Sequence, residues 1–367
     1  MSTAFSVYLD LVRFLAACLV YIYHSNQRFV ITEILPISQY GHSAVMVFFV
    51  LSGYVIAYIS DTKERDWITY SASRLSRVYS VALPAIILTL LLDSSGRVLM
   101  PDIYASYPYD QFLLRTLASL SFSNEVWFIS ITAFSNIAYW SVCYELWYYV
   151  FFGLLVFLPR RTGVFFAVLL ALALGPKVML LAPIWGLGVL LYRWQALTKL
   201  SIGAALWLLV ASTTGIIWFH SADIAPKTTE WLRTIIGPES VLQLTHSKYF
   251  LSDTLLGILV FANFAAMRKV ALQIAPLLLA IKRPVRFLAG YTFSLYLLHE
   301  PLFAFWAATL HGDPSNLGYW LATTSLVAAS VVIVGYFTEN KRHILRAWFE
   351  RVLQRVSILL RTTVNAR

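Results

Sequence analysis

Charged residues are scarce in this sequence. Only 13% of its 367 residues are Asp, Glu, Lys or Arg, while 59% are hydrophobic and the mean hydropathy is +0.70. An ordinary soluble domain is about one quarter charged, and no long polar stretch is present to form even one such domain. The composition therefore excludes a water-soluble fold. It predicts an all-α, polytopic membrane protein.

Cysteine is scarce as well, and the chain has no internal repeat. The two cysteines, Cys18 and Cys143, lie inside apolar segments, so no disulfide framework is expected. The first apolar segment has no basic region before it and no clear cleavage site after it. It therefore indicates a retained membrane span rather than a signal peptide.

Ten apolar segments are candidates for membrane spans by their length. The pair 163–176 and 178–194 is short, and the stretch 112–122 is too short to span, so we expect it at the membrane interface. An even number of spans places both termini on one side of the membrane. That side would carry 20 Lys and Arg residues against seven on the other, so the positive-inside rule predicts cytoplasmic termini in an inner or plasma membrane. The predicted spans are 7–26, 42–60, 78–96, 137–158, 163–176, 178–194, 200–220, 249–267, 287–310 and 318–338.

The C-terminal segment differs from the rest of the chain. We predict a membrane domain over residues 1–340 and a basic amphipathic cytoplasmic tail over residues 341–367. A helical tail would lie on the anionic inner leaflet, and packing against another subunit is the alternative. The positive-inside bias accounts for the net charge of +10, so no nucleic-acid partner is required. The helical face of the tail is formed by Ile344, Leu345, Trp348, Phe349, Val352, Leu353 and Val356, with Arg346, Arg351 and Arg355 elsewhere.

The first span, LDLVRFLAACLVYIYHS, carries polar residues that lipid does not favour. Arg13 and His24 are eleven residues apart, about three helical turns, so they share a face and lie roughly 16 Å apart along the axis. Asp10 is one turn before Arg13 on that face. This arrangement predicts a polar stripe through the membrane. The alternative is an Asp10–Arg13 ion pair with a histidine at the interface.

A second polar group lies in the stretch WSVCYELWYY. Glu145 is about two turns inside its predicted span, with Ser141 one turn earlier on the same face and Tyr144 beside it. A buried carboxylate needs a partner. Glu145 either neutralises Arg13 or polarises a catalytic histidine, and the sequence leaves both interpretations open.

Two further groups complete the candidate site. His299 and Glu300 lie at membrane depth in YTFSLYLLHEPLF. Arg74 and Arg77 are i and i+3 neighbours at the expected cytoplasmic mouth. Together with Arg13 they would form a cationic funnel for a phosphorylated ligand, although paired arginines at such a boundary also serve to fix topology.

Five motifs in this order resemble the acyltransferase 3 family, integral membrane proteins that O-acylate surface carbohydrates. The resemblance covers residues 7 to about 340 and is closest to the stand-alone form without an SGNH domain. One position departs from the family, because Met46 stands where many members have aspartate. The motifs are R-x10-H (Arg13, His24), FFxxSG (FFVLSG, 48–53), RxxR (Arg74, Arg77), SxxYE (Ser141, Tyr144, Glu145) and YLxHxP (SLYLLHEP, with His299).

The resemblance implies an acyl-CoA donor, usually acetyl-CoA, that enters from the cytoplasm as a co-substrate. It also implies a glycan or glycolipid hydroxyl as acceptor, for instance in an exopolysaccharide or lipopolysaccharide. No permanently bound cofactor and no metal are expected. Direct transfer and an acyl-histidine intermediate both remain open.

Roles follow for the candidate residues. Arg13, Arg74 and Arg77 would bind the donor. His24 would take the proton from the acceptor hydroxyl, with Glu145 orienting the ring, and Ser141 and Tyr144 would donate to the developing oxyanion. His299 is a further catalytic candidate. The rival hypothesis is a transporter or flippase of a glycolipid or small polar solute, which would neither hydrolyse acyl-CoA nor transfer from it.

Overall fold

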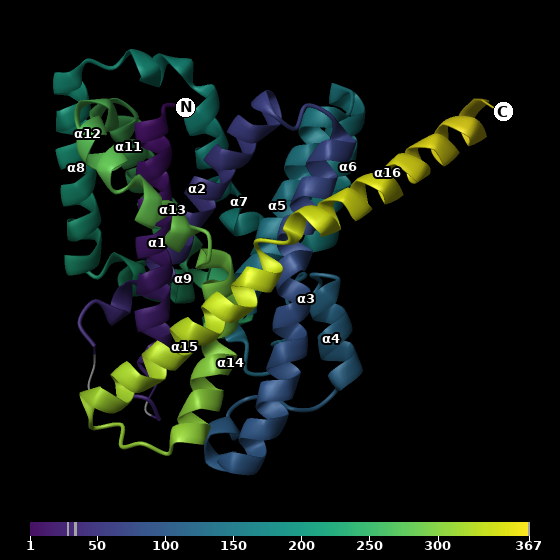
Figure 1. Cartoon of the computed structure of the whole chain (residues 1–367). Helices are drawn as coiled ribbons and strands as arrows, with labels where there is room; N and C mark the ends of the chain where they lie inside the picture. The colour runs from purple at the N-terminus through teal and green to yellow at the C-terminus, as the bar shows by residue number, and fades with distance from the viewer. Residues whose placement is uncertain (28, 33–34, 366–367) are drawn as a thin grey trace.

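The computed structural model describes residues 1–27, 29–32 and 35–365, and within these ranges the protein consists of helices and connecting loops with no strand (Figure 1). The all-α prediction is therefore confirmed for the described residues. The helices are α1 (Thr3–Ser25), α2 (Gly41–Thr62), α3 (Trp67–Leu99), α4 (Phe112–Leu120), α5 (Trp140–Phe157), α6 (Arg160–Leu174), α7 (Pro176–Arg193), α8 (Ile202–Ser221), α9 (Ile224–Ile236), α10 (Pro238–Gln243), α11 (Phe250–Gln273), α12 (Ala275–Ala280), α13 (Lys282–Ala289), α14 (Thr292–Leu310), α15 (Leu317–Thr338) and α16 (Arg342–Asn365), with short 3₁₀ turns at Ser38–Tyr40, Pro101–Tyr104, Ile137–Tyr139, Gln195–Lys199 and Thr245–Tyr249.

The membrane character of the chain rests on its long apolar helices. Seven helical segments of the described chain are long and apolar enough to cross a bilayer. The other three of the ten predicted spans fall on α6, α7 and α14, which are helical but only 15, 18 and 19 residues long. The protein is therefore a multi-pass membrane protein. The seven segments are Thr3–Ser25, Ser38–Thr62, Trp67–Leu99, Ile137–Phe157, Ile202–Ser221, Thr245–Gln273 and Leu317–Leu359.

Helices α2 and α7 pack closely because glycine lies on both sides of their crossing. A Cβ atom on Gly53 would stand 2.0 Å from the backbone oxygen of Trp185, and one on Gly188 would stand 2.0 Å from the backbone oxygen of Val50. Only glycine allows backbones to approach this closely. Gly53 belongs to the FFVLSG stretch, so one role of that motif is helix packing, and the crossing also fixes the position of the preceding Ser52.

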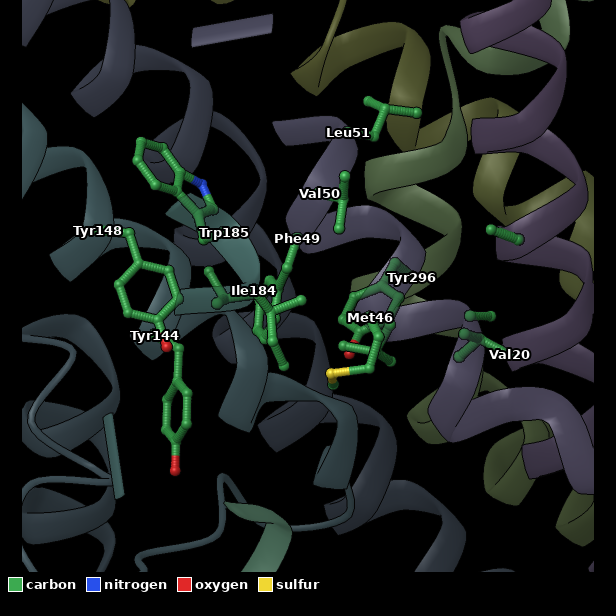
Figure 2. Packing of buried hydrophobic residues seen from close by; sticks show 14 of the residues in the cluster. Val20, Met46, Phe49, Val50, Leu51, Tyr144, Tyr148, Ile184, Trp185 and Tyr296 are labelled. Atoms are coloured by element: carbon green, nitrogen blue, oxygen red, sulfur yellow. The ribbon is translucent and has the colours of Figure 1, made fainter. Parts of the chain in front are cut away.

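Aromatic side chains fill the space where α2, α5 and α7 meet (Figure 2). The ring of Phe49 lies edge-on to Tyr148 with centroids 5.7 Å apart, and Tyr148 lies 6.0 Å from Trp185. Ring pairs at such distances add about 0.5–1.5 kcal/mol each beyond the burial of their area. Tyr144 and Tyr148 belong to this packed region and line neither of the cavities described below.

The C-terminal helix α16 extends away from the body of the bundle towards its end, as Figure 1 shows in yellow. Its first half packs against α3, where the ring of Phe349 lies 6.0 Å from that of Tyr79. The predicted apolar face is therefore divided. Phe349 is half-buried on α3, whereas Ile344 and Trp348 are exposed.

Candidate active site

Two cavities lie along α1 and α2, and many of the candidate residues line them. One, of about 380 Å³, is bounded by the middle of α1, the end of α2, the start of α3, and parts of α5, α14 and α16. We call it the cationic cavity, because six basic residues line it: Arg13, Lys63, Arg74, Arg77, Arg342 and Arg346. The other, of about 480 Å³, is bounded by the end of α1 and the start of α2. We call it the histidine cavity, because His24, His42 and His246 line it.

The two arginines of the RxxR motif have different surroundings in the cationic cavity. Arg74 is buried and donates from Nη2 to both carboxylate oxygens of Glu64, at 2.8 and 2.9 Å. The guanidinium of Arg77 instead lies over the ring of Phe293, 5.6 Å from its centroid. The described residues place no carboxylate within ion-pair distance of Arg77. Arg77 therefore lines the cavity without a close ion pair, although Tyr149, Glu145 and Glu339 act on its charge.

Arg13 faces the same cavity and also forms the ion pair that was the alternative interpretation. Its Nη1 atom lies 3.3 Å from Oδ1 of Asp10, and Asp10 in turn lies 3.9 Å from Arg286. Arg13 still lines the cationic cavity. The ion pair and a ligand-facing position therefore coexist.

Glu145 lies in the cationic cavity and makes no contact with a histidine. Its Oε1 accepts a 2.7 Å hydrogen bond from Ser52 and a short one from the hydroxyl of Tyr149. Ser52 also accepts from the indole of Trp185 at 3.2 Å. The serine of the FFVLSG motif thus holds the glutamate of the SxxYE motif. The expectation that Glu145 orients His24 does not fit this geometry.

His24 lies close to two ionisable residues of α14. Its Nδ1 lies 2.8 Å from Nε2 of His299, and its Nε2 lies 3.4 Å from Oε1 of Glu300. The other oxygen of Glu300 accepts from the backbone N–H of Ala138 at 2.6 Å. Oε1 of Glu300 is buried and has no hydrogen-bond partner within the described chain. This oxygen could therefore accept a hydrogen bond from Nε2 of His24 once that nitrogen is protonated.

The hydrogen bonds fix the tautomers of the two neutral rings. Nδ1 of His299 faces the backbone carbonyl of Leu295 at 3.0 Å. A carbonyl only accepts, so this nitrogen carries the proton and Nε2 of His299 is the acceptor. The proton between the rings therefore belongs to Nδ1 of His24. The lone pair of His24 is consequently on Nε2, the nitrogen beside Glu300.

A second pair of ionisable residues lies across the histidine cavity. Nε2 of His42 lies 2.9 and 3.1 Å from the two carboxylate oxygens of the buried Asp253 on α11. Nearby, the indole of Trp140 stacks on the ring of His246 with centroids 4.3 Å apart. Trp140 itself is buried, so His246 and His42 rather than the indole face give this side of the cavity its polar character.

The two cavities share one wall. Among the described residues, Val45 and Tyr296 line both. The hydroxyl of Tyr296 is 2.6 Å from Oγ of Ser141, which lines the cationic cavity. Tyr144 lines neither cavity, because its hydroxyl is buried against Oγ of Ser247 at 2.9 Å. The structure therefore brings Ser141 to the shared wall and places Tyr144 away from it.

The histidine cluster has the composition of a metal site. His24, His299 and Glu300 offer ligand atoms that all lie within 4.8 Å of one another. Two nitrogens bound to one tetrahedral zinc ion at ~2.0–2.1 Å are roughly 3.3 Å apart. The two ring nitrogens here are 2.8 Å apart. A shared proton fits this spacing better than a shared ion.

Comparison with known families identifies the chain. A family model described as an acyltransferase domain matches residues 6–339, nearly the whole sequence. The protein belongs to the acyltransferase 3 family. The resemblance inferred from the motifs is confirmed, and with it a membrane acyltransferase. Searches of curated proteins and of solved structures returned no match.

Several residues of this acyltransferase 3 site were not predicted to be functional. The sequence marks Glu300 as a polar residue at membrane depth, but no catalytic role is predicted for it. His42 and Asp253 each stand near the end of an apolar segment, which is a signal that a search for buried ionisable residues would find. Their pairing is not visible, because 211 residues separate them. Tyr296 gives no signal beyond its place in the YLxHxP motif.

Proposed function

We propose that this membrane acyltransferase moves an acyl group, most simply acetyl, from cytoplasmic acyl-CoA to a hydroxyl of a glycan or glycolipid on the other face of an inner or plasma membrane. One observation carries the proposal. A cavity lined by six basic residues and a cavity lined by histidines share the wall formed by Val45 and Tyr296. Coenzyme A is a polyanion, and the first cavity provides the charge to bind it.

The donor would enter the cationic cavity with its phosphates among the arginines. Arg77 lies over Phe293 without an ion pair within 4.0 Å in the described chain, and the pair of Arg74 with Glu64 holds a second guanidinium in place. The thioester would then reach the shared wall. There one of the two paired hydroxyls, of Ser141 or Tyr296, would donate to the thioester oxygen as negative charge develops on it, while the other donates to its neighbour.

The acceptor would occupy the histidine cavity, with its hydroxyl beside Nε2 of His24. His24 takes the hydroxyl proton while the oxygen attacks the thioester carbon. The C–S bond breaks, the ester forms, and the sulfur leaves as a thiolate that regains the proton from His24. Glu300 stabilises the imidazolium between these steps, because its free oxygen faces Nε2 at 3.4 Å. The acceptor would also hydrogen bond to His42, which lines the same cavity.

The test is acyl transfer by the purified protein in a defined bilayer. Proteoliposomes with [acetyl-¹⁴C]acetyl-CoA on one side and candidate glycans on the other should give labelled, base-labile ester on the glycan. Mass spectrometry of surface glycans from cells with and without the gene then identifies the acceptor by the O-acetyl group that is lost. A protein that moved a glycolipid or solute and left acetyl-CoA intact would contradict the proposal and support a carrier.

A further inference from the structure

The C-terminal helix reaches the cationic cavity from outside the family domain. The family match ends at residue 339, and α16 begins at Arg342. Even so, Arg342 and Arg346 line the cavity together with the RxxR arginines. We infer that these two side chains are part of the donor site and bind phosphate groups of the acyl-CoA. This inference rests on the proposed function.

Contacts before and after the first two turns of α16 hold this part of the helix over the cationic cavity. At the junction with α15, Glu339 accepts hydrogen bonds from the backbone N–H and the hydroxyl of Ser294 on α14, at 2.9 and 2.8 Å. About two turns after the start of α16 at Arg342, Phe349 packs on Tyr79 of α3. These anchors fix the direction of the helix between them.

Arg342 and Arg346 are i and i+4 neighbours, so they point to the same side of the helix. The segment between the anchors therefore presents its arginines to the cavity. Arg77 on α3 lines the same space, so charges from two helices converge there.

The charge balance of the cavity favours a polyanion. Arg13, Arg74 and Arg346 each have a carboxylate partner, at 3.3, 2.8 and 2.9 Å. Within the described residues, Lys63, Arg77 and Arg342 form no ion pair within 4.0 Å, although Glu339 is close enough to act on both arginines. Six basic residues line the cavity against two carboxylates, Glu64 and Glu145, so the lining carries an excess of positive charge that a polyanion can neutralise. The diphosphate and the 3′-phosphate of coenzyme A together supply the required charge.

The binding test compares two double substitutions on one helix. Arg342→Gln with Arg346→Gln removes two charges that line the cavity. Arg351→Gln with Arg355→Gln removes two charges from exposed positions that line no cavity. In neutral-lipid nanodiscs, the first pair should raise the Kd for acetyl-CoA about tenfold or more, the effect expected for loss of a charge-assisted contact. The second pair should leave Kd within roughly twofold, since exposed charges at a distance are screened.

Three further measurements show what the arginines recognise. Acetyl-pantetheine, which lacks the diphosphate and adenosine, should bind equally to all variants. Arg342→Lys with Arg346→Lys keeps the charge and should recover most of the affinity. Raising the salt concentration should narrow the difference between the glutamine pair and the unsubstituted protein. Monodispersity and thermal unfolding of each variant exclude a folding defect.

Lipid headgroups carry the same phosphate chemistry, so the measurement is repeated in nanodiscs with anionic lipid. If the glutamine pair binds acetyl-CoA as well as the unsubstituted protein in neutral discs, the inference is wrong, and a difference confined to anionic discs would assign the arginines to lipid. If the unsubstituted protein binds no acetyl-CoA, the proposed function fails and the inference fails with it. If acetyl-CoA binding in neutral discs is weakened only by the glutamine pair at Arg342 and Arg346, the result supports both the inference and donor binding in the proposed function.

Discussion

Nδ1 of His24 donates to Nε2 of His299 across 2.8 Å, and this contact joins residues that are 275 positions apart in the chain. The contact gives the two histidines unequal roles. His24 lines the histidine cavity, whereas His299 is buried behind it and reaches a reactant only through His24. In the proposed mechanism His24 is therefore the base, and His299 is a positioning residue that holds the tautomer of His24.

The first prediction follows from this difference. His24→Ala should keep acetyl-CoA binding and lower single-turnover transfer by about 10²–10⁴-fold, the usual contribution of a general base. His299→Ala should lower transfer less, and His299→Gln should recover part of that loss, because its amide oxygen can still accept from His24. A loss larger than this range for His24→Ala would favour an acyl-histidine.

The matched control is His343→Ala on the exposed surface of α16, which should be inert. Donor affinity and single-turnover transfer are measured side by side in each variant. Normal transfer by His24→Ala would show that this histidine is not the base.

The second prediction concerns the charge of Glu300. Glu300→Gln keeps an oxygen for the N–H of Ala138 but removes the negative charge beside His24. Transfer should fall roughly ten- to hundredfold, since hydrogen bonds to charged groups contribute about 1.5–3 kcal/mol. The Kd for acetyl-CoA should not change. The exposed Glu239→Gln is the control, and a Glu300→Gln variant with full activity would remove the carboxylate from the mechanism.

The third prediction separates the two arginines of the RxxR motif. Arg74→Ala strands the buried Glu64, so it should destabilise the fold by about 3–5 kcal/mol. Arg77→Ala has no such partner to strand and should weaken acetyl-CoA binding with little loss of stability. Thermal unfolding and donor affinity are the two measurements.

The double substitution Arg74→Ala with Glu64→Gln tests the reason for the difference. It should restore much of the stability, because neither charge is then left alone, without restoring donor affinity. Equal behaviour of Arg74→Ala and Arg77→Ala in both measurements would contradict the difference in their surroundings.

The fourth prediction concerns the crossing of α2 and α7. Gly53→Ala would place a methyl group 2.0 Å from the backbone oxygen of Trp185, so the helices must separate. Overpacking of this kind costs ~1–3 kcal/mol, and it also moves the adjacent Ser52 away from Glu145. Gly186→Ala on α7 is the control, because nothing lies within 4 Å of its added Cβ. The midpoint of thermal unfolding should fall for Gly53→Ala alone, and an unchanged midpoint would mean that the crossing tolerates a side chain.

The sequence predicts the family, the helical class and several of the polar residues that line the cavities. Spacing within one helix decides which residues share a face, so Arg13 with His24 and Arg74 with Arg77 can be chosen from the sequence. Motif order supplies the rest, including His299. These inferences work because they concern residues on one helix or in one short motif.

Contacts between helices could not be predicted in the same way. They depend on the rotation and crossing of each helix, which side-chain spacing does not fix. Glu145 was expected near His24, yet it contacts Ser52, while Glu300 takes the place beside His24. The position of Arg342 at the cationic cavity depends on the hydrogen bond from Ser294 to the preceding Glu339. That hydrogen bond spans 45 residues and has no local pattern.

The shared wall at Val45 and Tyr296 has a consequence for the barrier function of the membrane. Both side chains line the two cavities, so they stand between them. In the proposed mechanism only the acyl group would pass this point, and the donor and the acceptor would each stay in its own cavity. On that mechanism, a smaller residue in place of Tyr296 would join the two cavities, so the size of this side chain would help the membrane remain a barrier while a group is transferred across it.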